Sequence, residues 1–119
     1  MGNLSQSLDE LMQIDGATAA AVVDSNSGMV LGKAGGGLDL DVAGAGNTEV
    51  VRAKIKTMKS LGLKDGIEDI LITLGKQYHI IRPMTERAGV FVYVVLDKAK
   101  ASLALARIKT AEIESGLTL

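Results

Sequence analysis

Residues 67–96 read IEDILITLGKQYHIIRPMTERAGVFVYVVL, and this stretch predicts three consecutive antiparallel strands. The first strand covers 67–74, and a Gly-Lys turn returns the chain into a second strand over 77–82. Pro83 ends the second strand, because proline has no backbone N–H to donate to a neighbouring strand. The third run, 89–96, is apolar at successive positions, which predicts a central strand that is covered on both faces.

The composition indicates a single domain over residues 1–119 with an aliphatic core. Apolar residues make up 47% of the chain and aromatic residues only 3%, so alanine, valine, isoleucine and leucine must fill the interior. A chain of this length buries roughly two-thirds of its unfolded surface. No apolar run approaches the ~20 residues of a membrane span, so we expect no span.

Charge and cysteine content narrow the function classes. The chain has no cysteine, which excludes disulfides, thiol catalysis and cysteine metal sites and is typical of a reducing compartment. The first residues lack the charged and apolar regions of a signal peptide. A net charge of −1 argues against a nucleic-acid partner. We therefore expect a cytoplasmic protein.

Helical patterns flank the three strands. Near the N-terminus, a leucine stripe at helical spacing predicts an amphipathic helix with Asn3 as its N-cap, paired with Gln6 in a capping box, and Gly16 after its end. Strands at 17–23 and 29–34 are expected to form a hairpin, which supplies a partner for the 89–96 strand.

Two more helices complete the prediction. The second begins either near Asp39 or near Asn47, since nearby glycines weaken its first turns, and it stops at Gly62. The third is capped by Asp97 and ends at Gly116. Its expected buried stripe is Ala101, Ala104, Leu105, Ile108 and Ala111. The predicted class is α/β (α+β), in the order α-β-β-α-β-β-β-α.

This order resembles the Roadblock/LC7 family over about residues 3 to 115. The resemblance is carried by LDEL at 8–11 before IDG at 14–16, by AAAVVD at 19–24 and GMVL at 28–31, and by VFVYVVLD at 90–97 before a closing helix. The glycines around Ala45 depart from the alanine-rich helix that is usual in the family.

The resemblance implies a five-stranded antiparallel sheet of order 2-1-5-4-3. It places helix 2 on one face and helices 1 and 3 on the other. It also implies homodimers or heterodimers with regulatory or scaffolding work. Family members accompany Ras-like small GTPases or serve as dynein light chains, and prokaryotic single-domain members can act as GTPase-activating partners.

The residues offer little catalytic chemistry. His79 is the sole histidine, and a strand-surface role is favoured over that of a catalytic base. Asp39 and Asp41 could share a hard cation, but acids are common at a helix N-terminus. The glycine groups 35–37 and 44–46 lack the Lys-Ser/Thr pair of a phosphate loop. We predict no catalytic residue, no cofactor and no metal.

One charge feature points to a partner. Five of the thirteen basic residues fall between positions 52 and 64, namely Arg52, Lys54, Lys56, Lys59 and Lys64. They form either a solvated helix face or an electropositive surface for an acidic protein. We name Arg52, Lys56 and Lys59 as partner-binding residues, with a Ras-like GTPase as the expected partner.

The implied sheet order makes the 67–74 strand an edge, which predicts a homodimer. Natural edge strands are usually protected by proline, charge or shortness, whereas this one continues without protection. Pairing with the same strand of a second chain would remove the free edge. The predicted interface residues are Val51, Ile55, Met58, Ile70, Leu71, Ile72, Thr73 and Leu74.

Two function classes remain, and the family resemblance implies the first of them. The first is a non-catalytic homodimeric regulator or scaffold for a Ras-like GTPase, including the GTPase-activating role that prokaryotic family members can have. The alternative is a small-ligand sensor or a general interaction scaffold. The alanine-rich 17–23 strand argues against the sensor, because small side chains favour close packing over a cavity.

Overall fold

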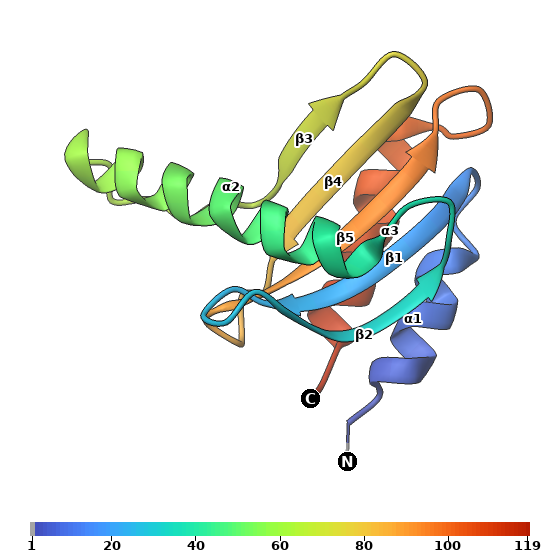
Figure 1. The fold of residues 1–119 in the computed structure, drawn as a ribbon, viewed down its shortest axis with the longest axis horizontal. Coiled ribbons are helices and arrows are strands. Elements are labelled where there is room, and N and C mark those ends of the chain that lie inside the picture. Colours follow the sequence, from blue (N-terminus) through green and yellow to red (C-terminus); the bar gives the residue numbers. More distant parts are fainter. Residues whose placement is uncertain (1) are drawn as a thin grey trace.

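The computed structural model describes residues 2–119, which form three helices and a five-stranded sheet (Figure 1). The elements are α1 (Leu4–Met12), β1 (Ala17–Asp24), β2 (Met29–Gly35), α2 (Leu40–Ser60), β3 (Ile70–Thr73), β4 (Gln77–Pro83), β5 (Val90–Asp97) and α3 (Leu103–Gly116). All paired strands are antiparallel, in the order β2-β1-β5-β4-β3. The predicted fold class, element order and strand order are confirmed.

β5 lies at the centre of the sheet, as its continuous apolar sequence predicts. Every residue from Val90 to Leu96 is buried. β1 pairs with one side of β5 and β4 with the other, so that Val92 lies opposite Val22 and Arg82. The hairpin of β1 and β2 therefore supplies the missing partner strand, as expected.

Two apolar layers sandwich the sheet. α1 and α3 cover the face that carries Val22, Ile80 and Val94, and α2 covers the opposite face, which carries Phe91 and Tyr93. In Figure 1, α2 crosses in front of the sheet, whereas α1 and α3 lie behind it. The predicted distribution of helices between the two faces is confirmed.

The earlier of the two predicted starts for α2 is correct. Asp39 is the N-cap, and its carboxylate accepts hydrogen bonds from the backbone N–H groups of Asp41 and Val42 at 3.0 and 3.1 Å. Gly44 has a packing role, since a Cβ there would lie 2.7 Å from Val30 Cγ2. The glycine that weakens the helix locally thus lets α2 approach β2.

The predicted capping box of α1 is wrong. Asn3 precedes the helix, but its side chain makes no cap hydrogen bond. Instead, its amide nitrogen donates to the Gly116 carbonyl at 2.8 Å, and its amide oxygen accepts from the Thr118 N–H at 2.8 Å. Asn3 therefore ties the N-terminal helix to the end of the chain.

α3 differs most from its prediction. Its N-cap is Ser102, and Asp97 instead ends β5, where its carboxylate accepts the Ala99 N–H at 2.9 Å within a turn. The expected stripe is also wrong, because Leu105 and Ile108 are 44% and 56% exposed. The residues of α3 that are buried are Ala106, Thr110 and Glu114.

β3 is shorter than the predicted 67–74 strand. Asp69 lies outside it and accepts two hydrogen bonds from Arg107 of α3, at 2.8 and 2.9 Å. Leu74 also falls outside, in the turn to β4. Within residues 2–119, no helix has both the length and the apolarity to cross a membrane.

Candidate functional site

β3 forms one edge of the sheet and pairs with β4 alone. Its residues Ile70, Leu71 and Ile72 are half-buried, whereas Thr73 is exposed. Leu74, just beyond the strand, is 43% exposed. The structure thus gathers these five predicted interface residues along one open backbone edge.

The helix that covers this region extends beyond the sheet. In Figure 1, α2 begins over β1 and its C-terminal half projects past the strands. Val51 lies where the helix still covers the sheet and is only 3% exposed. Ile55 is 41% exposed and Met58 is half-buried. Of the three predicted helix contacts, Ile55 and Met58 therefore offer surface to a partner, while Val51 belongs to the core of its own chain.

The predicted partner-binding residues share one side of the projecting helix. Arg52, Lys56 and Lys59 are all exposed. Three ion pairs occur in residues 2–119, Lys33–Asp41, Arg82–Glu114 and Arg107–Asp69, and none involves these bases. The three positive charges are therefore available to a ligand.

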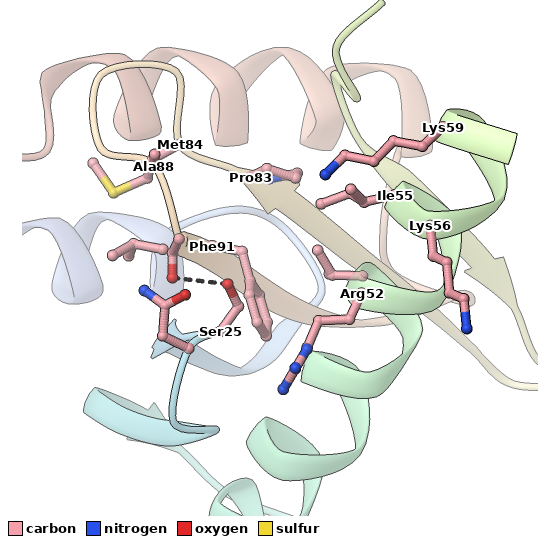
Figure 2. Close-up of a pocket in the computed structure, with 13 residues that line it drawn as sticks. Ser25, Arg52, Ile55, Lys56, Lys59, Pro83, Met84, Ala88 and Phe91 are labelled. Carbon is pink, nitrogen blue, oxygen red and sulfur yellow. Dashed lines mark hydrogen bonds between the residues drawn. The ribbon is translucent and has the colours of Figure 1, made fainter. Parts of the chain in front are cut away.

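The same three bases border a groove of about 610 Å³ (Figure 2). One wall is the C-terminal half of α2, and the other is formed by the β1–β2 turn and the loop between β4 and β5. Apolar side chains lie between these walls, namely Val51, Ile55, Pro83, Met84, Val90 and Phe91. No acidic residue is present among the described residues that line it.

Two loops far apart in the sequence meet at the second wall. The backbone N–H and the hydroxyl of Ser25 both donate to the Gly89 carbonyl, at 2.7 and 2.9 Å. Gly89 has φ +84°, a conformation that side chains other than glycine rarely adopt. The β1–β2 turn is thereby held against the start of β5, and Asn26 is placed at the edge of the groove.

His79 lies inside a hydrogen-bonded cluster on the α2 side of the sheet. Its Nδ1 is 2.9 Å from the Tyr93 hydroxyl, and its Nε2 is 2.9 Å from Gln77 Oε1. Because the glutamine oxygen can only accept, Nε2 carries the proton and Tyr93 donates to Nδ1. Desolvation by burial lowers the pKa of His79. Burial also raises the pKa of Tyr93, and the neighbouring Asn47 side chain offsets part of that rise.

The imidazole of His79 and the phenol of Tyr93 are therefore neutral at physiological pH, and both imidazole nitrogens already have partners inside the sheet.

The described residues include no group of three or more histidine, cysteine, aspartate or glutamate side chains that could hold a metal ion. Asp39, one of the two acids weighed as cation ligands, instead caps α2. The other, Asp41, forms an ion pair with Lys33.

Sequence reasoning missed the groove because its walls are far apart in the chain. Ser25, Pro83 and Phe91 come from three separate segments, and no local pattern links them to Arg52. The one available signal was Gly89, just before β5, which indicates a sharp turn. It does not indicate which segment packs against that turn.

Comparison with solved structures places this fold among known ones. Myxococcus xanthus MglB matches with a TM-score of 0.81 at 20% identity, over 93% of this chain and 88% of that one. A Roadblock/LC7 domain from Streptomyces avermitilis matches with a TM-score of 0.81 at 16% identity, over 95% and 92%. A structure described as MglB with tetrameric arrangement matches with a TM-score of 0.82 at 18% identity, over 96% and 84%.

No protein-family model and no curated protein sequence matches the chain. The protein has the fold of Roadblock/LC7 domains, and the expected resemblance is confirmed at the level of structure.

Proposed function

We propose that the protein is a homodimeric, non-catalytic regulator or scaffold that binds a Ras-like small GTPase in the cytoplasm. One observation carries the proposal: an open β3 edge lies beside a helix that projects past the sheet and bears three unpaired bases. The likeness to MglB supports a regulator of this type.

The dimer forms through β3 and α2. Two β3 strands pair across a two-fold axis and extend the sheet through both chains. The projecting part of α2 then covers the partner's sheet, so that Met58 loses water contact, whereas Ile55 faces the groove beneath the helix. Without this pairing, the outer N–H and C=O groups of residues 70–73 would remain a template for aggregation.

The GTPase binds at the basic side of α2. Arg52, Lys56 and Lys59 increase the association rate with an acidic surface, and salt weakens that attraction. If hydrolysis is stimulated, the dimer does so by positioning groups of the GTPase, since positioning and electrostatics dominate phosphoryl transfer.

The test uses purified full-length protein and the Ras-like GTPase encoded nearest to its gene. We expect the Lys56→Glu/Lys59→Glu variant to bind at least about tenfold more weakly, and wild-type affinity to fall with added salt. Lys54→Glu is the matched control, because Lys54 lies on the same helix outside the groove. An affinity that changes neither with added salt nor in the Lys56→Glu/Lys59→Glu variant would contradict the proposal.

A small-ligand sensor is the weaker alternative. Such a domain needs space between helix and sheet, but Gly44 allows α2 to pack directly on Val30. The alanines of β1 under the same helix are fully buried. The open groove near the end of α2 therefore suits a protein partner better than an enclosed ligand.

A further inference from the structure

We propose that the groove under the C-terminal half of α2 holds an acidic segment of the partner protein that carries an apolar side chain. This inference rests on the proposed function, because it gives the chemistry of the partner segment. Its evidence is the charge, shape and construction of the groove.

The charged residues that line the groove are all basic. Figure 2 shows Arg52 and Lys59 extending from α2 toward the space over the groove, while Lys56 points away. A base in the last turn of a helix is explained by the helix dipole, but that effect is confined to the terminal turn. The helix dipole therefore explains a base at Lys59, in the last turn of α2, but not the base at Arg52, near the middle of the helix.

The groove also has an apolar strip. Ile55 is 41% exposed, Ala88 is exposed and Pro83 is half-buried. These three side chains come from α2, from the β4–β5 loop and from the end of β4. A site for free phosphate would not need them, whereas an apolar side chain flanked by carboxylates satisfies both the strip and the bases.

The walls are held in place before any ligand arrives. Ser25 is bonded to the Gly89 carbonyl, as described above, and the Met84 N–H donates to the Val90 carbonyl at 2.8 Å. The Val90 N–H donates in turn to the Arg87 carbonyl at 3.3 Å. A prearranged groove binds a segment with little ordering cost on the protein side.

Dimer formation leaves the groove accessible. None of the β3 residues lines it, so pairing of the two β3 edges does not fill it. Each protomer of the proposed dimer therefore presents its own groove, at the ends of β4 and β5 away from the shared edge.

The test uses the isotopically labelled full-length protein and three synthetic peptides, followed by NMR. The first peptide is rich in glutamate and carries one leucine, the second replaces the leucine with glycine, and the third replaces the glutamates with lysines. We expect the first to shift the amide signals of Ile55, Gly89 and Phe91. We expect the second to bind about tenfold more weakly and the third not to bind.

Variants locate the binding. Arg52→Glu/Lys59→Glu should abolish the shifts, and Lys54→Glu should leave them unchanged. Shifts that appear outside the groove, equal binding of the lysine peptide, or equal competition by inorganic phosphate would each overturn the inference. GTPase binding is measured on the same variants. If the GTPase binds the wild type and loses affinity for Lys56→Glu/Lys59→Glu, but the glutamate peptide does not bind the groove, the inference fails and the proposed function stands. A dimer that binds the peptide but no GTPase overturns the proposed function.

Discussion

Arg82 and Glu114 form an ion pair between β4 and α3 with Nε and Oε1 2.8 Å apart, and the glutamate side chain is only 1% exposed. The other glutamate oxygen accepts the Thr85 N–H at 3.4 Å. A buried carboxylate of this kind is tolerated because its partners replace water.

Removing the arginine should therefore be costly. We expect Arg82→Ala to lower the free energy of unfolding by about 3 kcal/mol, because it leaves a buried charge without its partner. Urea denaturation measures the change. Lys33→Ala is the control, since it breaks an exposed pair with Asp41 and should cost less than about 1 kcal/mol. Equal effects of the two substitutions would show that burial is unimportant here.

Two glycines of α2 should respond in opposite directions to alanine. Gly44→Ala places a methyl group 2.7 Å from Val30 Cγ2, and we expect a net loss of about 1–2 kcal/mol despite the gain in helix propensity. Gly46 has no atom within 4 Å of its virtual Cβ, so Gly46→Ala should stabilise by about 1 kcal/mol. Thermal unfolding of both variants checks the contrast, which disappears if α2 can shift away from β2.

The wild-type protein should be a dimer at micromolar concentration by light scattering. Thr73→Lys places a charge on the proposed shared edge and should yield monomers, while Ile72→Pro should yield monomers or aggregates because it disrupts the ladder. Leu31→Lys, on the opposite edge strand β2, is the matched control and should remain dimeric. A monomeric wild-type mass would exclude the proposed assembly.

Arg52 separates binding from catalysis. It lies on a helix among lysines and is exposed, so we expect Arg52→Ala to weaken GTPase binding several-fold with little change in turnover at saturation. Single-turnover GTP hydrolysis at saturating protein measures this. If turnover instead collapses while affinity holds, Arg52 acts as an inserted catalytic arginine.

His79 predicts a pH dependence of stability. Burial keeps its pKa below the ordinary value of 6.5 in the folded protein, so the unfolded chain binds the proton first as pH falls. Stability is then full above that ordinary value and declines as pH drops through it toward the folded pKa. Urea melts from about pH 8 to about pH 5, compared with His79→Gln, test this, because the chain has one histidine. An identical decline in the variant would assign the effect to other groups.

Local sequence pattern was sufficient to predict a segment whose residues all lie in the same environment. The apolar run that became β5 could only be a central strand, because no other place in a sheet buries both faces. For α2, local pattern left two starts open, at Asp39 and at Asn47, and the structure decides for Asp39, whose carboxylate accepts the N–H groups of Asp41 and Val42. The family resemblance, not periodicity, supplied the strand order.

Periodicity failed where polar residues are buried by distant partners. On α3, Thr110 and Glu114 are buried because the Ala106 carbonyl and Arg82 satisfy them, while Leu105 faces solvent. The apolar stripe of α3 therefore predicted the wrong face of the helix as the buried one. β3 was also predicted too long, and Asp69, just before it, is bonded to Arg107 of the distant helix α3.

The sequence by itself determined the elements, the central strand and the concentration of bases near the end of α2, because each depends on neighbours within a few residues. Only the tertiary structure decided that Arg52 and Lys59 border the same groove as Ser25 and Phe91. That arrangement depends on two loops meeting through the Gly89 carbonyl, a contact between segments more than sixty residues apart. Local propensity carries no information about such a contact, since its free energy exists only in the folded chain.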